Sequence, residues 1–249
     1  SFFVGSDVFY THLVRNDCWW LCRGDELEER LSNAAEARRR ILEGEFPDRV
    51  LRQFSEMLDY FGQSPLIVRS SSLLEDSYGN AFSGKYDSFF CANQGKPRER
   101  MAAFLDAVRK VYASAVSEDA LVYRDRCGLL DQDEQMALLV QRVSGNRHGD
   151  AFMPHAAGVG FSFNAYAWHE DIEPEAGMLR MVAGLGTRAV DRTDDDYATL
   201  VALNAPEAHP ATVREDPKRF SQKHIDVVDL GENRFRSLDL EELVRNRNG

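Results

Sequence analysis

Residues 65–90 read PLIVRSSSLLEDSYGNAFSGKYDSFF, and this stretch decides how the whole chain is interpreted. It opens with the apolar run Leu66–Val68, which predicts a buried strand, and a second strand-like run extends from Tyr86 to Cys91. The polar residues between these runs are Arg69, the serines Ser70–Ser72, the acidic pair Glu75–Asp76 and the loop Ser77–Gly84. A guanidinium, clustered hydroxyls and free backbone N–H groups are what proteins use to bind polyphosphates. The stretch therefore predicts a polyphosphate site between two strands.

Arg69 has two interpretations from its sequence position alone. At the end of a buried strand it can form a structural ion pair with Glu75 or Asp76. It can equally act as a bidentate clamp on a transferring phosphoryl group, where negative charge develops in the transition state. The residue pattern leaves both interpretations open.

Residues Gly79–Lys85 have the spacing G-x-x-x-x-G-K of a P-loop. Residue 86 is tyrosine, however, where a P-loop carries its magnesium-binding serine or threonine, and the residues that follow alternate like a strand. A P-loop NTPase requires a helix directly after Lys85. The sequence favours a glycine-rich flap between antiparallel strands, in which Gly84 lets the backbone approach the phosphates and Ser88 donates a hydroxyl.

The charge and composition exclude several classes of function. The 249 residues contain 30 Lys and Arg against 41 Asp and Glu, a formal net charge of −11, which disfavours a nucleic-acid surface or an anionic membrane as partner. No apolar run approaches the ~18 residues that cross a bilayer. The four cysteines lack paired C-x-x-C spacing and the six histidines lack H-x-H or H-E-x-x-H spacing, so no metal site is predicted. We expect a cytoplasmic protein with reduced thiols.

Hydrophobic periodicity predicts a helical front and a strand-rich back. Helices are predicted to begin near Ser6, Gly24, Pro47, Pro97 and Glu118. Apolar runs predict strands at residues 136–140, 157–163, 178–183, 197–203 and 225–230, followed by a helix over residues 240–245. We therefore predict an α+β fold with two lobes, residues 1–135 and residues 136–249.

Three short patterns receive a structural interpretation. The acidic run Asp131–Glu134 is interpreted as a solvated turn. The basic run Arg38–Arg40 near a helix end is typical of residues that complement the helix dipole. Gly184–Gly186 lacks the third glycine of a dinucleotide-binding turn and predicts a loop.

Residues 68–90 resemble the N-terminal nucleotide-binding region of the phosphoenolpyruvate synthase / pyruvate phosphate dikinase family, which carries V-R-S-S-A-x-x-E-D followed by S-F-A-G-x-x-x-T/S. Further segments resemble that family in the same order. LLVQRVSGN (residues 138–146) is similar to its V-Q-x-M-V hinge, AAGVGFSFN (residues 156–164) to its S-G-V-x-F-T/S strand, and MVAGLGTRAV (residues 181–190) to its G-L-G-E-x-V-V turn. The opening FFVGSDVFYTHL resembles its G-F-V-V-T-x-x-A-Y segment, so the resemblance extends over nearly the whole chain.

This resemblance implies an ATP-grasp-like, two-lobed module that uses ATP and Mg²⁺. It implies a dikinase-type phosphotransferase, which moves a phosphoryl group from ATP to a carrier histidine on another domain. Arg69 would be the catalytic clamp on the phosphates. The residues assigned to the nucleotide are Ser70, Ser83, Gly84 and Ser88 on the phosphate side and Gln141, Arg142 and Val143 along the adenine, the last three largely through backbone groups.

The sequence departs from the family pattern at three points. The family's G-G-K-G-x-N-L segment would lie before Ser1, and its magnesium-binding D-x-E…L-Q segment does not occur before Gly249, so no magnesium ligand is predicted in this chain. Thr187 stands where the G-L-G-E turn has its acidic residue. We expect part of a larger protein, with a phosphohistidine carrier domain and a pyruvate-binding barrel elsewhere. The alternative is a degenerate nucleotide-binding or regulatory module without catalysis.

Overall fold

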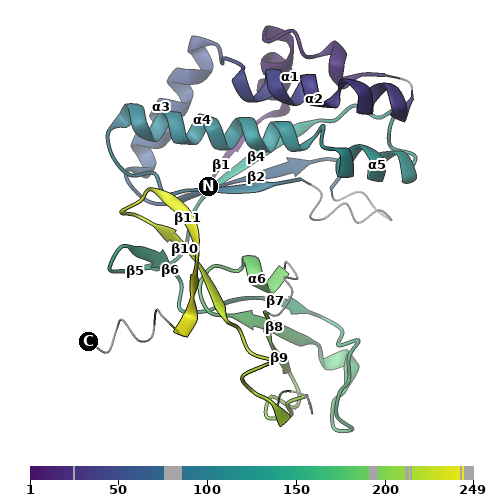
Figure 1. Cartoon of the computed structure of the whole chain (residues 1–249), viewed down its shortest axis with the longest axis vertical. Helices are drawn as coiled ribbons and strands as arrows, with labels where there is room; N and C mark the ends of the chain where they lie inside the picture. The colour runs from purple at the N-terminus through teal and green to yellow at the C-terminus, as the bar shows by residue number, and fades with distance from the viewer. Residues whose placement is uncertain are drawn as a thin grey trace. The chain divides into compact units, whose positions relative to one another are not determined.

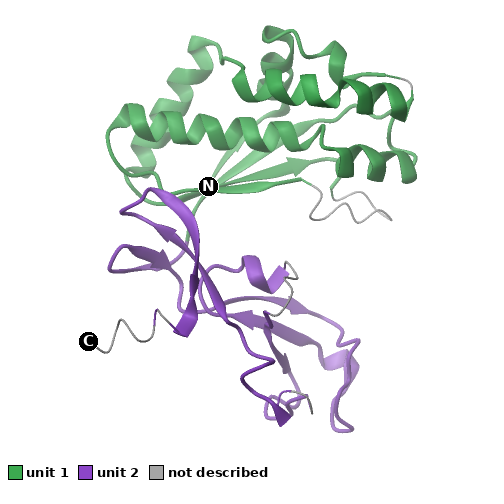
Figure 2. Cartoon of the chain, viewed as in Figure 1, with its two compact units in different colours: residues 1–143 green, residues 144–249 purple. Residues whose placement is uncertain are grey.

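The computed structural model describes residues 1–24, 26–75, 86–190, 196–210, 213, 215–241 and 243. The chain forms two compact units, residues 1–143 and residues 144–249 (Figure 2).

The first unit is built on an antiparallel sheet with the strand order β1-β4-β2-β3. Its strands are β1 (Phe2–Val4), β2 (Leu66–Ser72), β3 (Ser88–Cys91) and β4 (Met136–Arg142). Burial alternates along the two central strands: Val68 of β2 and Leu138 and Val140 of β4 are fully buried, whereas their neighbours are more exposed. Since successive side chains of a strand point to opposite faces, one face of this sheet forms the core and the other faces away from it.

Helices cover the buried face of the sheet (Figure 1). They are α1 (Ser6–Arg15), α2 (Leu27–Glu43), α3 (Asp48–Phe61), α4 (Pro97–Ser114) and α5 (Glu118–Arg126), with a short 3₁₀ turn, η1 (Trp20–Cys22). Helix α3 buries Val50, Phe54, Met57, Leu58 and Phe61, a spacing that places one apolar stripe toward the core. It ends at Gly62, whose φ of +60° favours glycine.

Local signals fix the beginnings of the last two helices. Pro97 occupies the first turn of α4, and the carboxylate of Glu99 accepts a hydrogen bond from the backbone N–H of Lys96 at 2.8 Å. The hydroxyl of Ser117 caps α5 by accepting a hydrogen bond from the backbone N–H of Ala120 at 3.2 Å.

The second unit contains two antiparallel sheets. One has the order β11-β10-β6-β5 and comprises β5 (Asn146–His148), β6 (Ala151–Met153), β10 (His224–Asp229) and β11 (Arg234–Asp239). The other has the order β7-β8-β9 and comprises β7 (Ala157–Phe161), β8 (Met178–Val182) and β9 (Thr199–Ala202). The short segments η2 (Pro174–Ala176) and α6 (Thr187–Val190) complete the unit. A small apolar core gathers around Met153, Ile225 and Val227.

The predicted mixture of helices and strands is confirmed. Residues 2–4 form β1 and pair with β4, a strand that the sequence pattern does not predict. Strand β11 was not predicted, and the helix expected over residues 240–245 lies largely outside the described residues. The two units divide after Val143, whereas the sequence division was placed before Met136; β4 pairs with β1 and β2 and so belongs to the first unit.

In the described parts of the chain, no helix is both long and apolar enough to cross a lipid bilayer.

Candidate functional site

Arg69 lies near the middle of a row of side chains across the sheet of the first unit. In the register of the strands it stands opposite Ser88 of β3 on one side and Leu139 of β4 on the other, and Leu139 stands opposite Phe3 of β1. Directly opposed residues lie on the same face of a sheet. Because Val68 next to Arg69 is buried under the helices, this row lies on the face that the helices leave open.

The guanidinium of Arg69 is exposed, and it has no hydrogen-bond or ion-pair partner among the described residues. Glu75, one of the two carboxylates that could have paired with it, accepts hydrogen bonds from the hydroxyl of Ser70 at 2.8 Å and the backbone N–H of Ser72 at 3.1 Å. Asp76, the other, lies outside the described residues. A cation that no described carboxylate pairs with, next to a serine hydroxyl, is suited to a phosphate group.

The open face combines this charge with apolar and amide groups. Phe3 is 78% exposed, and Ile67 and Leu139 are partly exposed around Arg69. Gln141 stands opposite Ile67 on the same face, with its amide 3.5 Å from the hydroxyl of Ser1. Apolar, amide and guanidinium groups therefore share this one face.

The structure brings together only some of the residues that the sequence assigned to the nucleotide. Arg69, Ser88 and Gln141 share the open face. Ser70 and Arg142 belong to the opposite face, since they stand opposite the fully buried Leu138 and Leu66. The remaining assigned residues are Val143, described below, and Ser83 and Gly84, which lie outside the described residues.

The two residues after Gln141 already have structural contacts. The guanidinium of Arg142 lies 5.9 Å from the ring centroid of Phe61, within the range of a cation–π interaction. Val143 is buried, and its backbone N–H donates a hydrogen bond to the carbonyl of Pro65 at 2.9 Å. The backbone N–H of Val143 is therefore engaged within the first unit.

The strand after the glycine-rich segment decides between the two phosphate-loop interpretations. Residues 88–91 form β3, which pairs antiparallel with β2, and the next helix begins only at Pro97. A P-loop requires a helix at this point. The P-loop interpretation of Gly79–Lys85 is excluded, and the expected strand is confirmed.

A buried polar cluster lies on the other face of the same strands, and sequence reasoning missed it. The side chain of Glu134 is 8% exposed and accepts hydrogen bonds from the hydroxyls of Ser72 and Tyr86. Arg124, 4% exposed, has its guanidinium 4.0 Å from the Glu134 carboxylate. The interpretation of Asp131–Glu134 as a solvated turn is wrong for Glu134. In the structure, residue 134 continues the alternation of the buried positions 136, 138 and 140, but residues 136–140 are all apolar, so the sequence alone does not show this alternation.

Burial dominates the protonation behaviour of this cluster. It raises the pKa of Glu134, although the hydrogen bonds from Ser72 and Tyr86 and the charge of Arg124 act in the opposite direction. Burial, together with the neighbouring Glu134 carboxylate, also raises the pKa of Tyr86 well above its ordinary value. Tyr86 is therefore a hydrogen-bond donor throughout the physiological pH range.

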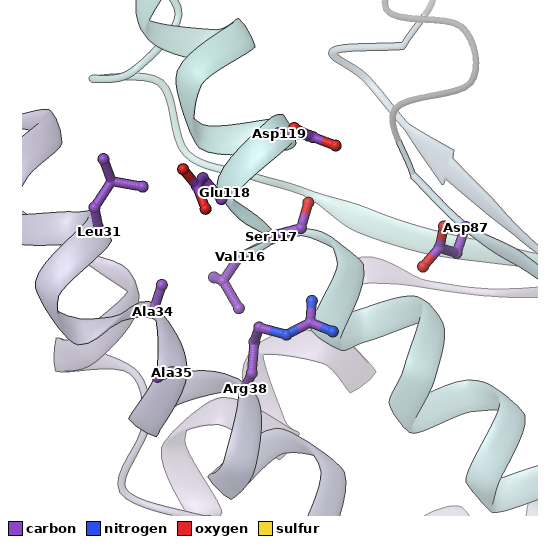
Figure 3. Close-up of a pocket in the computed structure, with 9 residues that line it drawn as sticks. All are labelled: Leu31, Ala34, Ala35, Arg38, Asp87, Val116, Ser117, Glu118 and Asp119. Carbon is purple, nitrogen blue, oxygen red and sulfur yellow. The ribbon is translucent and has the colours of Figure 1, made fainter.

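A surface pocket of about 700 Å³ opens in the helical layer of the first unit. In Figure 3, Arg38 reaches into it from α2, and Asp87 lies on the side next to β3. Glu118 and Asp119 add two further carboxylates, and the Arg38 guanidinium donates to the carbonyl of Ala113 at 2.8 Å. Carboxylates outnumber the cation, so this pocket is a poor site for a phosphate.

The basic run that contains Arg38 forms local contacts. Arg39 and Arg40 both donate to the carboxylate of Glu36, at distances between 2.7 and 2.9 Å, and Arg39 also pairs with Glu43 at 2.6 Å. These are surface ion pairs along one helix, and they have no bearing on the open face of the sheet.

In the second unit, the glycine turn after β8 packs against β10. Gly184 has a φ of +82°, and a Cβ at this position would lie 2.5 Å from Cγ1 of Ile225. The hydroxyl of Thr187 donates to the carboxylate of Asp226 at 2.6 Å, and the guanidinium of Arg188 donates to the same carboxylate at 3.0 Å. The residue at the acidic position of the resembled turn is thus tied to a buried aspartate of its own unit.

Two comparisons show which known proteins this chain is similar to. The family model for the AMP/ATP-binding domain of pyruvate phosphate dikinase matches residues 1–244. Rifampicin phosphotransferase from Streptomyces sviceus is 31% identical over 139 residues, a match that covers 55% of this chain and 14% of that protein. This relative is therefore a much longer protein than the part that the match covers.

Proposed function

This chain belongs to the family of the AMP/ATP-binding domain of pyruvate phosphate dikinase, and on that premise we propose that it is the ATP-binding portion of a dikinase-type phosphotransferase. In this proposal the phosphoryl group passes from ATP to a carrier histidine on another domain, and a further domain holds the final acceptor. The fold is ATP-grasp-like, with the two compact units as its lobes, and the protein acts in the cytoplasm.

The observation that carries the proposal is exposed Arg69, which stands opposite Ser88 and whose guanidinium has no ion-pair partner among the described residues. A guanidinium can donate two parallel hydrogen bonds to phosphate oxygens, and such charge-assisted bonds are about twice as strong as neutral ones. The same group stabilises the charge that develops on a phosphoryl group during transfer. Arg69 would therefore hold the phosphates, and the Ser88 hydroxyl would donate to them from the adjacent strand.

The other assigned residues enter the proposal with different support. Gln141 shares the open face, which favours a contact with the bound nucleotide. Arg142 and Val143 at the adenine, and Ser83 and Gly84 at the phosphates, stay predictions from the resemblance. The hydroxyl of Ser70 donates to Glu75, so its part would be to shape the strand rather than to touch the nucleotide.

Magnesium is the usual partner of ATP in phosphoryl transfer. Among the described residues, no group of three or more His, Cys, Asp or Glu side chains is placed to hold a metal ion. The proposal therefore assigns no magnesium ligand and no metal-dependent step to the described residues.

Binding measurements with matched arginine variants test this proposal. Since a hydrogen bond to a charged group contributes about 1.5–3 kcal/mol, Arg69→Ala should weaken ATP binding by roughly 10- to 150-fold in isothermal titration calorimetry and leave adenosine binding unchanged. Arg69→Lys should recover part of the affinity, because it keeps the charge and loses the bidentate geometry. Arg39→Ala is the control, since Arg39 is also exposed and its ion pairs lie on α2. Equal ATP affinity in Arg69→Ala and Arg39→Ala would contradict the proposal.

One observation favours a second candidate function, a nucleotide-binding or regulatory module without catalysis. Thr187 stands at the acidic position of the resembled turn and has no carboxylate, and its hydroxyl donates a hydrogen bond to Asp226. Incubation of the intact parent protein with γ-labelled and β-labelled ATP separates the two candidates. Labelled phosphohistidine supports the phosphotransferase, whereas ATP binding without any phosphohistidine supports the regulatory module.

A further inference from the structure

The carboxylate of Glu134 joins two stretches of chain that lie on either side of residues 76–85. Its Oε1 accepts a hydrogen bond from the hydroxyl of Ser72, the last residue of β2. Its Oε2 accepts one from the hydroxyl of Tyr86, two residues before β3 begins. One side chain therefore holds the end of one strand and the approach to its neighbour.

Two of the groups around Glu134, Ser72 and Arg124, form further hydrogen bonds. The hydroxyl of Ser72 also accepts from the backbone N–H of Leu74 at 3.0 Å, and the Glu75 carboxylate accepts from the backbone N–H of Ser72 at 3.1 Å. Arg124 approaches Glu134 on one side and donates to the carbonyl of Gln132 at 2.6 Å on the other. The cluster thus ties the turn before β4 to the ends of β2 and β3.

Stability alone does not account for a carboxylate at this position. Burying a charged group costs several kcal/mol unless it is paired and hydrogen-bonded, and an apolar side chain of similar size often stabilises a protein equally well or better. The neighbouring positions of the same face, Met136 and Leu138, are apolar and fully buried. The distinct property of Glu134 is geometric, since its two oxygens fix two strands at once.

Arg69 and Ser88 lie three residues before Ser72 and two residues after Tyr86, respectively. We propose that Glu134 is a positioning residue for the phosphate site: it fixes the ends of β2 and β3, and thereby the spacing of the Arg69 guanidinium and the Ser88 hydroxyl on the opposite face. This inference rests on the proposed function and deepens it. The ligand class that it concerns is the polyphosphate of a nucleotide, and the effect of Glu134 is independent of the nucleoside.

Variants of the cluster separate positioning from folding in the full chain. Tyr86→Phe removes one hydroxyl that donates to Glu134, and Glu134→Gln keeps the size of the side chain and one acceptor oxygen. The matched control is Tyr112→Phe, because Tyr112 is fully buried in the same unit and its hydroxyl has no hydrogen-bond partner among the described residues. Calorimetry then compares the affinities of each variant for ATP and for adenosine.

Tyr86→Phe should weaken ATP binding by roughly tenfold and leave adenosine binding unchanged, since it loosens the phosphate side alone. Glu134→Gln should have a smaller effect than Glu134→Ala, which removes both acceptors. A purely structural role predicts equal losses for ATP and adenosine. Equal losses, or ATP affinities equal to that of Tyr112→Phe, would overturn the inference and leave the proposed function standing.

Hydrogen exchange measured by mass spectrometry gives a readout that does not depend on ATP. Peptides covering residues 70–75 and 86–91 should exchange faster in Tyr86→Phe and Glu134→Gln than in Tyr112→Phe, while peptides of α4 should be unchanged. If the unaltered chain fails to bind ATP, the proposed function fails, and the exchange result alone decides whether Glu134 fixes the two strands. Unchanged exchange in those peptides would overturn the inference.

Discussion

Replacement of Arg188 by alanine should strongly destabilise the second unit. The Arg188 guanidinium donates to Asp226 at 3.0 Å, to Asp196 at 2.6 Å and to the hydroxyl of Ser237 at 2.7 Å. The side chain of Arg188 is only 15% exposed, that of Asp196 4% and that of Asp226 7%. Arg188→Ala would leave two buried carboxylates facing each other without their shared cation.

The expected loss of unfolding free energy depends on the hydrogen bonds that each carboxylate keeps in Arg188→Ala. Removing one partner of a buried ion pair costs about 3–5 kcal/mol. Asp196 would still accept from the backbone N–H groups of Lys223 and His224, and Asp226 would still accept from Thr187. We therefore expect the lower end, about 3 kcal/mol, which is a large share of the ~5–15 kcal/mol that stabilises a typical domain. With a urea dependence of about 1–3 kcal/mol per molar, the midpoint should fall by about 1–3 M.

The assay is hydrogen exchange of the β10 and β11 amides as a function of urea, which measures the opening free energy of this unit. Arg147→Ala provides the control, because Arg147 lies in the same unit, is 66% exposed and pairs with Asp150 at 3.3 Å. An exposed pair of this kind contributes about 0–1 kcal/mol. Equal losses in the two variants would refute the reasoning that burial makes the Arg188 contacts important.

Three further outcomes are expected. Burial lowers the pKa of His12 below its ordinary value of 6.5, so its stabilising contribution should be complete above about pH 6.5 and should fall as the pH decreases toward the folded-state pKa. Melting curves recorded between about pH 7.5 and about pH 5 should show a melting temperature that depends less on pH in His12→Gln than in the unaltered chain. Gly184→Ala should cost about 1–3 kcal/mol in thermal unfolding, whereas Gly149→Ala, with a similar φ of +66° but no atom within 4 Å of the added Cβ, should cost less. Phe104→Ala should cost about 3–5 kcal/mol in urea unfolding because its ring is 1% exposed, against little change for the 78% exposed Phe3.

Much of the first unit could be predicted from local patterns. The spacing of apolar residues and the signals at Ser6, Pro47 and Pro97 predicted helices that begin at or next to these positions. The alternation after Tyr86 predicted β3 and therefore excluded a P-loop. These features are local, since a helix or strand needs only its own periodicity and its capping residues to be recognised.

Long-range pairing limited the rest of the prediction. Strand β1 has three residues, too few to show a period, and its partner β4 lies at the other end of the unit. Strand β11 has the polar sequence RFRSLD and is a strand because it pairs along its length with β10. The sequence of such a segment carries little information, because the partner strand supplies the hydrogen bonds that define it.

Strand β2 shows why the candidate site was only half visible in the sequence. The alternation of β2 places Arg69 on the open face and Ser70 and Ser72 on the covered face. Neighbouring polar residues of this strand therefore lie in two different surroundings. From the sequence, the serines are predicted to form one cluster of phosphate-binding hydroxyls. The structure divides them: the Ser70 hydroxyl donates to half-buried Glu75 and the Ser72 hydroxyl donates to the buried side chain of Glu134. The guanidinium of Arg69, by contrast, has no partner among the described residues. Successive residues of a strand point to opposite faces. A sequence therefore separates a binding residue on one face from anchoring residues on the other only when this alternation is followed from the apolar part of the strand into its polar end.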